Sequence, residues 1–188
     1  STVGREVLPF GDIRFIKAEN VLNNTVVAEP ANFIDKKTNE MICRSQLEES
    51  DILFVIAGAT IGKVAILPLE LCPANTNQAV SFIRLKNKET VLFVWYWLQS
   101  DFIKKVLWLD AVQSAQANLS MENLGNFHVP FPSLPEQSAI VTHIETECTR
   151  LDAIIDKFKK QIELFKEYRT TLISEVVTGK IDEIGRAS

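Results

Sequence analysis

The chain has 188 residues, of which 46% are hydrophobic and 23% charged, as in globular proteins large enough to bury a core. Its net charge is −4, and residues 1–134 carry 12 basic and 14 acidic groups, so a nucleic-acid partner would have to bind a local patch. Three widely spaced cysteines exclude a disulfide scaffold and predict reduced thiols. With no signal sequence or long apolar run recognisable, we expect a cytoplasmic protein without membrane contact.

The N-terminal part begins with a predicted strand over residues 13–16, and Lys17 lies at its end. Residues 23–50 are polar and are predicted to be irregular. A loop region of this length within a compact domain is often functional, although a solvated surface remains the alternative for each of its residues. Its candidate ligand-binding residues are Lys36, Lys37, Asn39 and Arg44.

Residues 51–67 predict two buried strands, 52–57 and 64–67, joined by the turn GATIGK. This turn resembles a phosphate-binding loop, but three residues separate Gly58 from Gly62 and Val64 follows Lys63. The spacing therefore excludes a nucleotide site and favours a tight or bulged hairpin. Lys63 beside the turn is a candidate phosphate contact, and a plain exposed lysine is the alternative.

Residues 72–78 form a predicted polar turn before a strand over residues 79–85. Its amide and hydroxyl side chains suit either base edges or the backbone, and we expect Asn75 to stabilise the turn. Two helices are predicted next, over 91–99 with Thr90 as cap and over 101–109 with Ser100 as cap. The aromatic residues of the first helix point in several directions at helical spacing, which favours core packing over a stacking platform.

Residues 113–120 are predicted to form a polar loop, which ends at a cap, Ser120, for a short helix over residues 121–125. Its candidate base-contacting residues are Gln113, Gln116 and Asn118. A last strand is predicted over residues 127–131. The proline-rich connection PFPSLP follows it.

The strongest pattern is a helix over residues 135–178, with Pro135 in its first turn and Gly179 as C-terminal cap. Its apolar residues recur as the two rows of a heptad repeat, interrupted at Arg169. At 1.5 Å per residue the helix spans about 66 Å, so we favour pairing with another helix over a helix folded back or broken. The predicted dimer seam is Ile144, Cys148, Leu151, Ile155, Phe158, Ile162, Phe165, Leu172 and Val176.

Three stretches in this order resemble the specificity subunit of type I restriction–modification systems. They are DILFVIAGATIGKVAIL with NQAV, then SAQANLSMENLGNFHVPFPSLPEQSAIV, then KEYRTTLISEVVTGKID. The most specific parts are VPFPSLPEQSAI and the closing LISEVVTGKID. The resemblance covers nearly the whole chain.

The resemblance implies an α+β fold: a mixed α/β target recognition domain over residues 1–134, one long coiled-coil helix over 135–179 and a tail over 180–188. The domain would recognise one half of a bipartite site in double-stranded DNA. Paired antiparallel helices would act as a spacer and scaffold the modification subunits, which hold S-adenosylmethionine, and through them the restriction subunit. With one such unit present, we expect either a half-size subunit that forms a homodimer or the C-terminal half of a longer protein, with residues before Ser1 missing.

The residues themselves show no glycine-rich cofactor loop, metal cluster or nucleophile–base pair, which favours a non-catalytic protein without a cofactor. A coiled-coil interaction protein without DNA specificity is the first alternative, and a small methyltransferase is the second. The predicted DNA contacts are Lys17, Lys36, Lys37, Asn39, Arg44, Lys63, Gln113, Gln116 and Asn118.

Overall fold

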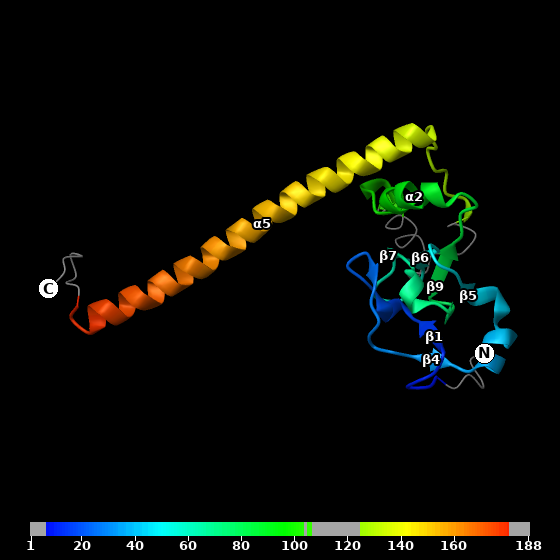
Figure 1. The fold of residues 1–188 in the computed structure, drawn as a ribbon, viewed down its shortest axis with the longest axis horizontal. Coiled ribbons are helices and arrows are strands. Elements are labelled where there is room, and N and C mark those ends of the chain that lie inside the picture. The colour runs from blue at the N-terminus through cyan, green and yellow to red at the C-terminus, as the bar shows by residue number, and fades with distance from the viewer. Residues whose placement is uncertain (1–6, 104, 107–124, 181–188) are drawn as a thin grey trace. The chain divides into compact units, whose positions relative to one another are not determined.

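The computed structural model describes residues 7–103, 105–106 and 125–180. They belong to two units, residues 1–138 and 139–188. All the strands of the described residues lie in the first unit. Helix α5 (Leu134–Val177) begins in the first unit and forms the second unit up to Val177. The predicted α+β class is therefore confirmed (Figure 1). The strands are β1 (Ile13–Ile16), β2 (Val21–Leu22), β3 (Thr25–Val26), β4 (Phe33–Ile34), β5 (Gln46–Leu47), β6 (Ile52–Val55), β7 (Val64–Ile66), β8 (Ala74–Thr76) and β9 (Val80–Ile83).

The strands form one four-stranded sheet, one three-stranded sheet and the separate hairpin β2–β3. The four-stranded sheet has the order β4-β1-β8-β5, in which β1 and β8 run parallel and the other neighbours antiparallel. The three-stranded sheet has the order β7-β6-β9 and is antiparallel. The helical elements of the first unit include α1 (Lys36–Met41), α2 (Val91–Leu98) and the 3-10 turns η1 (Ala18–Asn20), η2 (Cys43–Ser45), η3 (Leu69–Leu71) and η4 (Lys88–Thr90).

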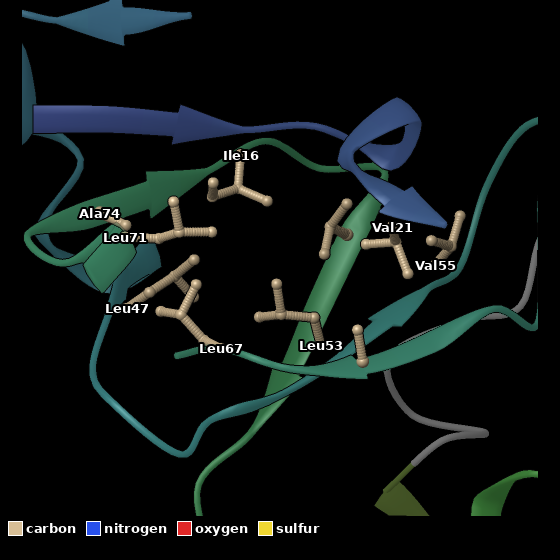
Figure 2. Close-up of a cluster of buried hydrophobic side chains, with 10 residues drawn as sticks. Ile16, Val21, Leu47, Leu53, Val55, Leu67, Leu71 and Ala74 are labelled. Atoms are coloured by element: carbon tan, nitrogen blue, oxygen red, sulfur yellow. The ribbon is translucent and has the colours of Figure 1, made fainter. Parts of the chain in front are cut away.

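The main core joins the two larger sheets. Ile16 and Ala74 from the four-stranded sheet pack with Leu53 and Val55 from β6. Figure 2 shows their side chains gathered between β1 and the strands β6 and β7. All four residues of β6 are fully buried, which explains why its sequence is continuously apolar rather than alternating.

The predicted strands that begin at residues 13, 52, 64 and 79 are confirmed, each to within two residues. The prediction of an irregular stretch over residues 23–50 is wrong in detail, because it contains α1 and the short strands β3, β4 and β5. Residues 127–131 form no strand. Phe127 instead packs edge-on against Trp97, with 6.3 Å between the ring centroids.

Helix α2 is confirmed, but both predicted caps act differently. Thr90 makes no capping bond; its hydroxyl donates to the carbonyl of Asn87 at 2.7 Å, because the turn η4 already precedes the helix. Ser100 Oγ is buried and has no hydrogen-bond partner within the described residues. The next predicted helix is helical over residues 101–103 and 105–106, and its remainder lies outside the described residues, as does most of the helix predicted over 121–125.

Both predicted ends of α5 are confirmed. Pro135 is the second residue of the helix. Backbone N–H groups in the first turn have no acceptor within the helix, so the missing N–H of proline costs no hydrogen bond there. At the other end Gly179 has φ +70°. The Gly179 N–H donates to the carbonyl of Val176 at 3.1 Å, and the Lys180 N–H donates to Glu175 at 2.9 Å. These two bonds are those of a Schellman C-cap.

Candidate nucleic-acid interface

Two loops meet at one end of the three-stranded sheet. The register pairs Val55 with Val80 and Phe54 with Val64, so the end of β6 lies beside the starts of β7 and β9. The loop between β6 and β7 and the turn before β9 therefore emerge together. A hydrogen bond of 2.9 Å from the Ile56 N–H to the Ala79 carbonyl joins them.

The β6–β7 loop is a hairpin turn, as predicted. Gly58 and Gly62 have φ of +95° and +85°, a conformation that side chains disfavour, and the Gly62 N–H donates to the Val55 carbonyl at 2.8 Å. The loop joins antiparallel strands and leads into no helix, so it lacks the geometry of a phosphate-binding loop. Lys63 is half-buried and has no ion-pair partner within the described residues.

Lys63 lines a cleft of about 450 Å³ that also includes Asn24 and Gln99. Asn23 and Asn24 form the tip of the β2–β3 hairpin with φ of +50° and +62°, as in a type I′ turn. Sequence reasoning missed Asn24 and Gln99, because only the folding of three separate segments brings them beside Lys63.

The segment α1–η2 carries most of the predicted basic contacts. Asp35 caps α1 by accepting the Thr38 N–H at 2.6 Å, and this hydrogen bond lowers the pKa of the Asp35 carboxyl below its ordinary value. Lys36 and Lys37 in the first turn of α1 are exposed, and so is Arg44 in η2. These three side chains have no ion-pair partner within the described residues.

A buried amide holds this segment in place. Asn75 is fully buried, and its Nδ2 donates to Asn39 Oδ1 at 2.8 Å and to the Ile42 carbonyl at 3.3 Å. Its Oδ1 accepts the Thr76 N–H at 2.7 Å. The expected stabilising role of Asn75 is confirmed, and it extends beyond the local turn to a segment far away in the sequence.

An ion-pair cluster around Arg84 fixes β5, the strand that follows η2. Arg84 donates to both oxygens of the buried Asp51 at 2.8 and 2.7 Å, to Glu48 Oε1 at 2.7 Å and to the Gln46 carbonyl at 3.0 Å. The hydrogen bonds to Asp51 raise the pKa of the Arg84 guanidinium. This clamp ties β5, which continues from η2, to the end of β9.

Of the predicted DNA contacts, Lys36, Lys37, Arg44 and Lys63 keep free charged groups within the described structure. Two others are already engaged. Lys17 Nζ donates to Asn32 at 2.8 Å and lies 3.8 Å from Glu19, and the side-chain oxygen of Asn39 accepts from Asn75. Gln113, Gln116 and Asn118 lie outside the described residues.

The predicted seam runs along α5. Apart from Ile144, which is half-buried, its residues are exposed, and Phe158 and Phe165 expose 60% and 72% of their surface. Charged pairs such as Arg150–Glu147 and Lys159–Asp156 occupy other positions of the same helix. An exposed apolar row between charged flanks is the pattern of a helix that pairs with another helix.

The described residues contain no cluster of three or more potential metal ligands and no helix that is apolar and long enough to cross a membrane. Cys43, Cys72 and Cys148 form no disulfide within the described residues. Burial raises the pKa of the Cys72 thiol, which makes this cysteine less reactive than an exposed one.

The family model of the type I restriction modification DNA specificity domain matches residues 6–164. The chain therefore belongs to the family of type I restriction–modification specificity subunits, and the suspected resemblance is confirmed.

Two curated relatives are also named as specificity subunits of type I restriction enzymes. The chain is 30% identical over 151 residues to the type I restriction enzyme EcoBI specificity subunit of Escherichia coli, covering 80% of this chain and 31% of that protein. It is 25% identical over 173 residues to the MjaVIII specificity subunit of Methanocaldococcus jannaschii, covering 90% and 40%. The crystal structure of the HsdS subunit from Thermoanaerobacter tengcongensis shares the fold, with a TM-score of 0.64 and 16% identity over 99% of this chain and 48% of that one. The chain thus spans less than half the length of these relatives.

Proposed function

We propose that this chain is the non-catalytic DNA-recognition module of a type I restriction–modification enzyme and binds one half of a bipartite site in double-stranded DNA. The observation that carries the proposal is that unpaired cationic side chains lie on a loop and on short helical segments of a rigid scaffold. Lys63 lies on the β6–β7 loop, Lys36 and Lys37 lie in α1 and Arg44 lies in η2, and the sheets and the buried Asn75 hold these segments in place. Preorganised loops of this kind suit recognition of a ligand with fixed geometry.

The chemistry of these groups matches DNA. Lysine and arginine side chains contact phosphates or guanine, and amide side chains pair with adenine. Because the net charge is −4, binding depends on the local clusters and not on the charge of the whole chain. Each phosphate contact releases counterions, so the affinity decreases with salt concentration.

The second element of the proposal is a homodimer in which two copies of α5 pack antiparallel along the seam. Its exposed apolar side chains support this arrangement, because pairing removes them from water. Two recognition domains would then lie at opposite ends of one spacer. In a longer chain with two such units, the same seam would pair within one molecule.

The third element is a scaffold for the modification subunits and, through them, the restriction subunit in the cytoplasm. Leu164 and Tyr168 lie one helical turn apart, outside the seam, and expose 55% and 66% of their surface. A single partner helix along the seam leaves Leu164 uncovered, since it lies about 120° around the helix from Phe158. These residues suit the docking of another subunit.

Filter binding of random duplex DNA by the purified chain, across a range of salt concentrations, tests the core of this proposal. We expect measurable binding that weakens steeply with salt. Equilibrium dialysis with S-adenosylmethionine should show no binding to the isolated chain. A dimer without DNA affinity would favour the coiled-coil interaction protein, and cofactor binding would favour a methyltransferase.

A further inference from the structure

A second cleft, of about 430 Å³, lies between two segments that are far apart in the sequence. Residues 41–45, from the end of α1 and η2, form one wall, and residues 76–78, before β9, form the other. Thr76 and Val80 are buried, whereas Arg44 and Gln78, one on each wall, are exposed. The cleft therefore has a buried base and an exposed rim, on which Arg44 and Gln78 are polar and Met41 is apolar.

Arg44 and Gln78 differ from the other polar residues of this cleft. The hydroxyls of Ser45 and Thr76 donate to backbone carbonyls at 3.0 and 2.8 Å, and Asn77 Oδ1 accepts a backbone N–H at 3.0 Å. These three side chains stabilise the walls. The side chains of Arg44 and Gln78 have no such partner within the described residues and are available to a ligand.

The walls are held at a fixed separation by the buried Asn75. Its amide nitrogen donates to the carbonyl of Ile42, which belongs to the first wall, and to Oδ1 of Asn39, which lies just before that wall. Its amide oxygen accepts the N–H of Thr76 in the second wall. Because this amide is fully buried, water does not compete for its hydrogen bonds. The rim is therefore preorganised, which lowers the entropy cost of binding a rigid partner.

We propose that Arg44 and Gln78 are specificity-determining residues that contact base edges of the DNA half-site from the two walls of this cleft. The proposal rests on the proposed DNA-binding function and extends it to a named pair. The guanidinium of Arg44 presents donors that match guanine O6 and N7, and the Gln78 amide presents a donor and an acceptor that match adenine N7 and N6. A phosphate offers acceptors alone, so the neutral amide across from Arg44 favours a base edge over the backbone.

Selection from a pool of random duplex DNA by the full 188-residue chain tests this inference. The parent, Arg44→Ala, Gln78→Ala and Gln78→Glu are compared. We expect the parent to enrich a defined motif, and each alanine variant to lose roughly 5- to 150-fold preference at one position of it. Gln78→Glu should prefer a different base at its position, because it replaces a donor by an acceptor. Affinity for DNA that lacks the motif should change little in Gln78→Ala, whereas the added negative charge of Gln78→Glu should weaken binding to all DNA.

The matched control is Lys86→Ala, which removes one exposed positive charge beyond the opposite end of β9. It should weaken binding at most slightly and leave the motif unchanged. Thermal melting of each variant separates a loss of recognition from a loss of folding. If the parent enriches a motif and the variants at positions 44 and 78 enrich the same motif equally strongly, the inference fails and the proposed function stands. If the parent enriches no motif, both fail.

Discussion

At the scale of single residues, four consecutive polar side chains before β9 have different roles. Asn75 and Thr76 are buried and hydrogen-bonded, Asn77 stabilises the turn, and Gln78 is exposed. The sequence predicts a polar turn here, but it does not separate the four roles. The partner of Asn75 is Asn39, and a contact across such a separation leaves no local pattern.

Arg84 illustrates a residue whose importance comes from a buried partner. Replacing Arg84 with Met leaves the Asp51 carboxylate, which is 1% exposed, without its guanidinium. We expect a loss of about 2–3 kcal/mol in the free energy of unfolding, below the range for fully buried pairs because the Arg84 side chain is itself 39% exposed. Urea denaturation followed by circular dichroism measures this change.

Glu48→Gln is the control for that substitution. Glu48 binds the same guanidinium at 2.7 Å, but its side chain is 64% exposed, so the loss should stay within about 1 kcal/mol. Equal losses in the two variants would show that the burial of Asp51 does not determine the strength of the clamp.

Lys36 and Lys37 test the electrostatic part of the account. Replacing both with Ala should reduce the slope of log affinity against log salt concentration by about one unit for each lost phosphate contact. Filter binding with one duplex at several salt concentrations measures the slope. An unchanged slope would remove α1 from the DNA interface.

At the scale of elements, the sequence predicts best where one local signal decides the structure. The buried strand β6 is continuously apolar, and α5 has heptads together with both end signals. The two-residue strands β4 and β5 are set by pairing with the distant strands β1 and β8, which their own residues do not encode. Residues 127–131 alternate like a strand, but their apolar side chains line a cleft together with Trp97 and Phe82.

In the candidate site, too, the sequence predicts single residues better than it predicts which separate segments come together. Unpaired cations such as Arg44 and Lys63 could be predicted from composition and position in a loop. Their grouping with Gln78 and Asn24 could not, because each cleft is formed by separate segments that only the sheet register and the hairpins bring together.

The seam of α5 provides the prediction at this scale. Phe158→Asp places a charge in the middle of the proposed dry interface and should cost several kcal/mol of dimerisation free energy. Sedimentation equilibrium should then show a monomer at concentrations at which the parent is a dimer. A variant that dimerises like the parent would rule out pairing along this seam.

Leu164→Asp is the matched control on the same helix. Leu164 is an exposed apolar residue like Phe158 but lies outside the seam. This variant should still dimerise, while co-purification with the modification subunits should be lost. Loss of dimerisation in both variants would indicate general destabilisation of α5 and would not locate the seam.

At the scale of the whole molecule, the length of α5 should set the distance between two half-sites. Inserting one heptad after Phe158 in each helix keeps the seam in register and separates the domains by about 10 Å. At about 3.4 Å per base pair, the spacer of the DNA site should lengthen by roughly three base pairs. Activity should decrease, because the insertion rotates the helix by only about 20° relative to the seam while the DNA turns much further.

Sequencing of methylated sites in host DNA measures this spacer. The insertion lies in the second unit and leaves residues 1–138 unchanged, so the half-site sequences themselves should stay the same. Full activity with the parent spacer would show that the helix does not determine the distance between half-sites.

The central claim is that this chain recognises DNA sequence as a symmetric pair of modules, and selection from random duplex DNA by the purified parent chain tests it most directly. Two copies related by a two-fold axis should recognise the same half-site in opposite orientations. The account therefore predicts enrichment of an inverted repeat with a fixed gap, bound with an affinity that falls steeply with salt. Enrichment of no sequence, or binding that does not change with salt, would contradict it.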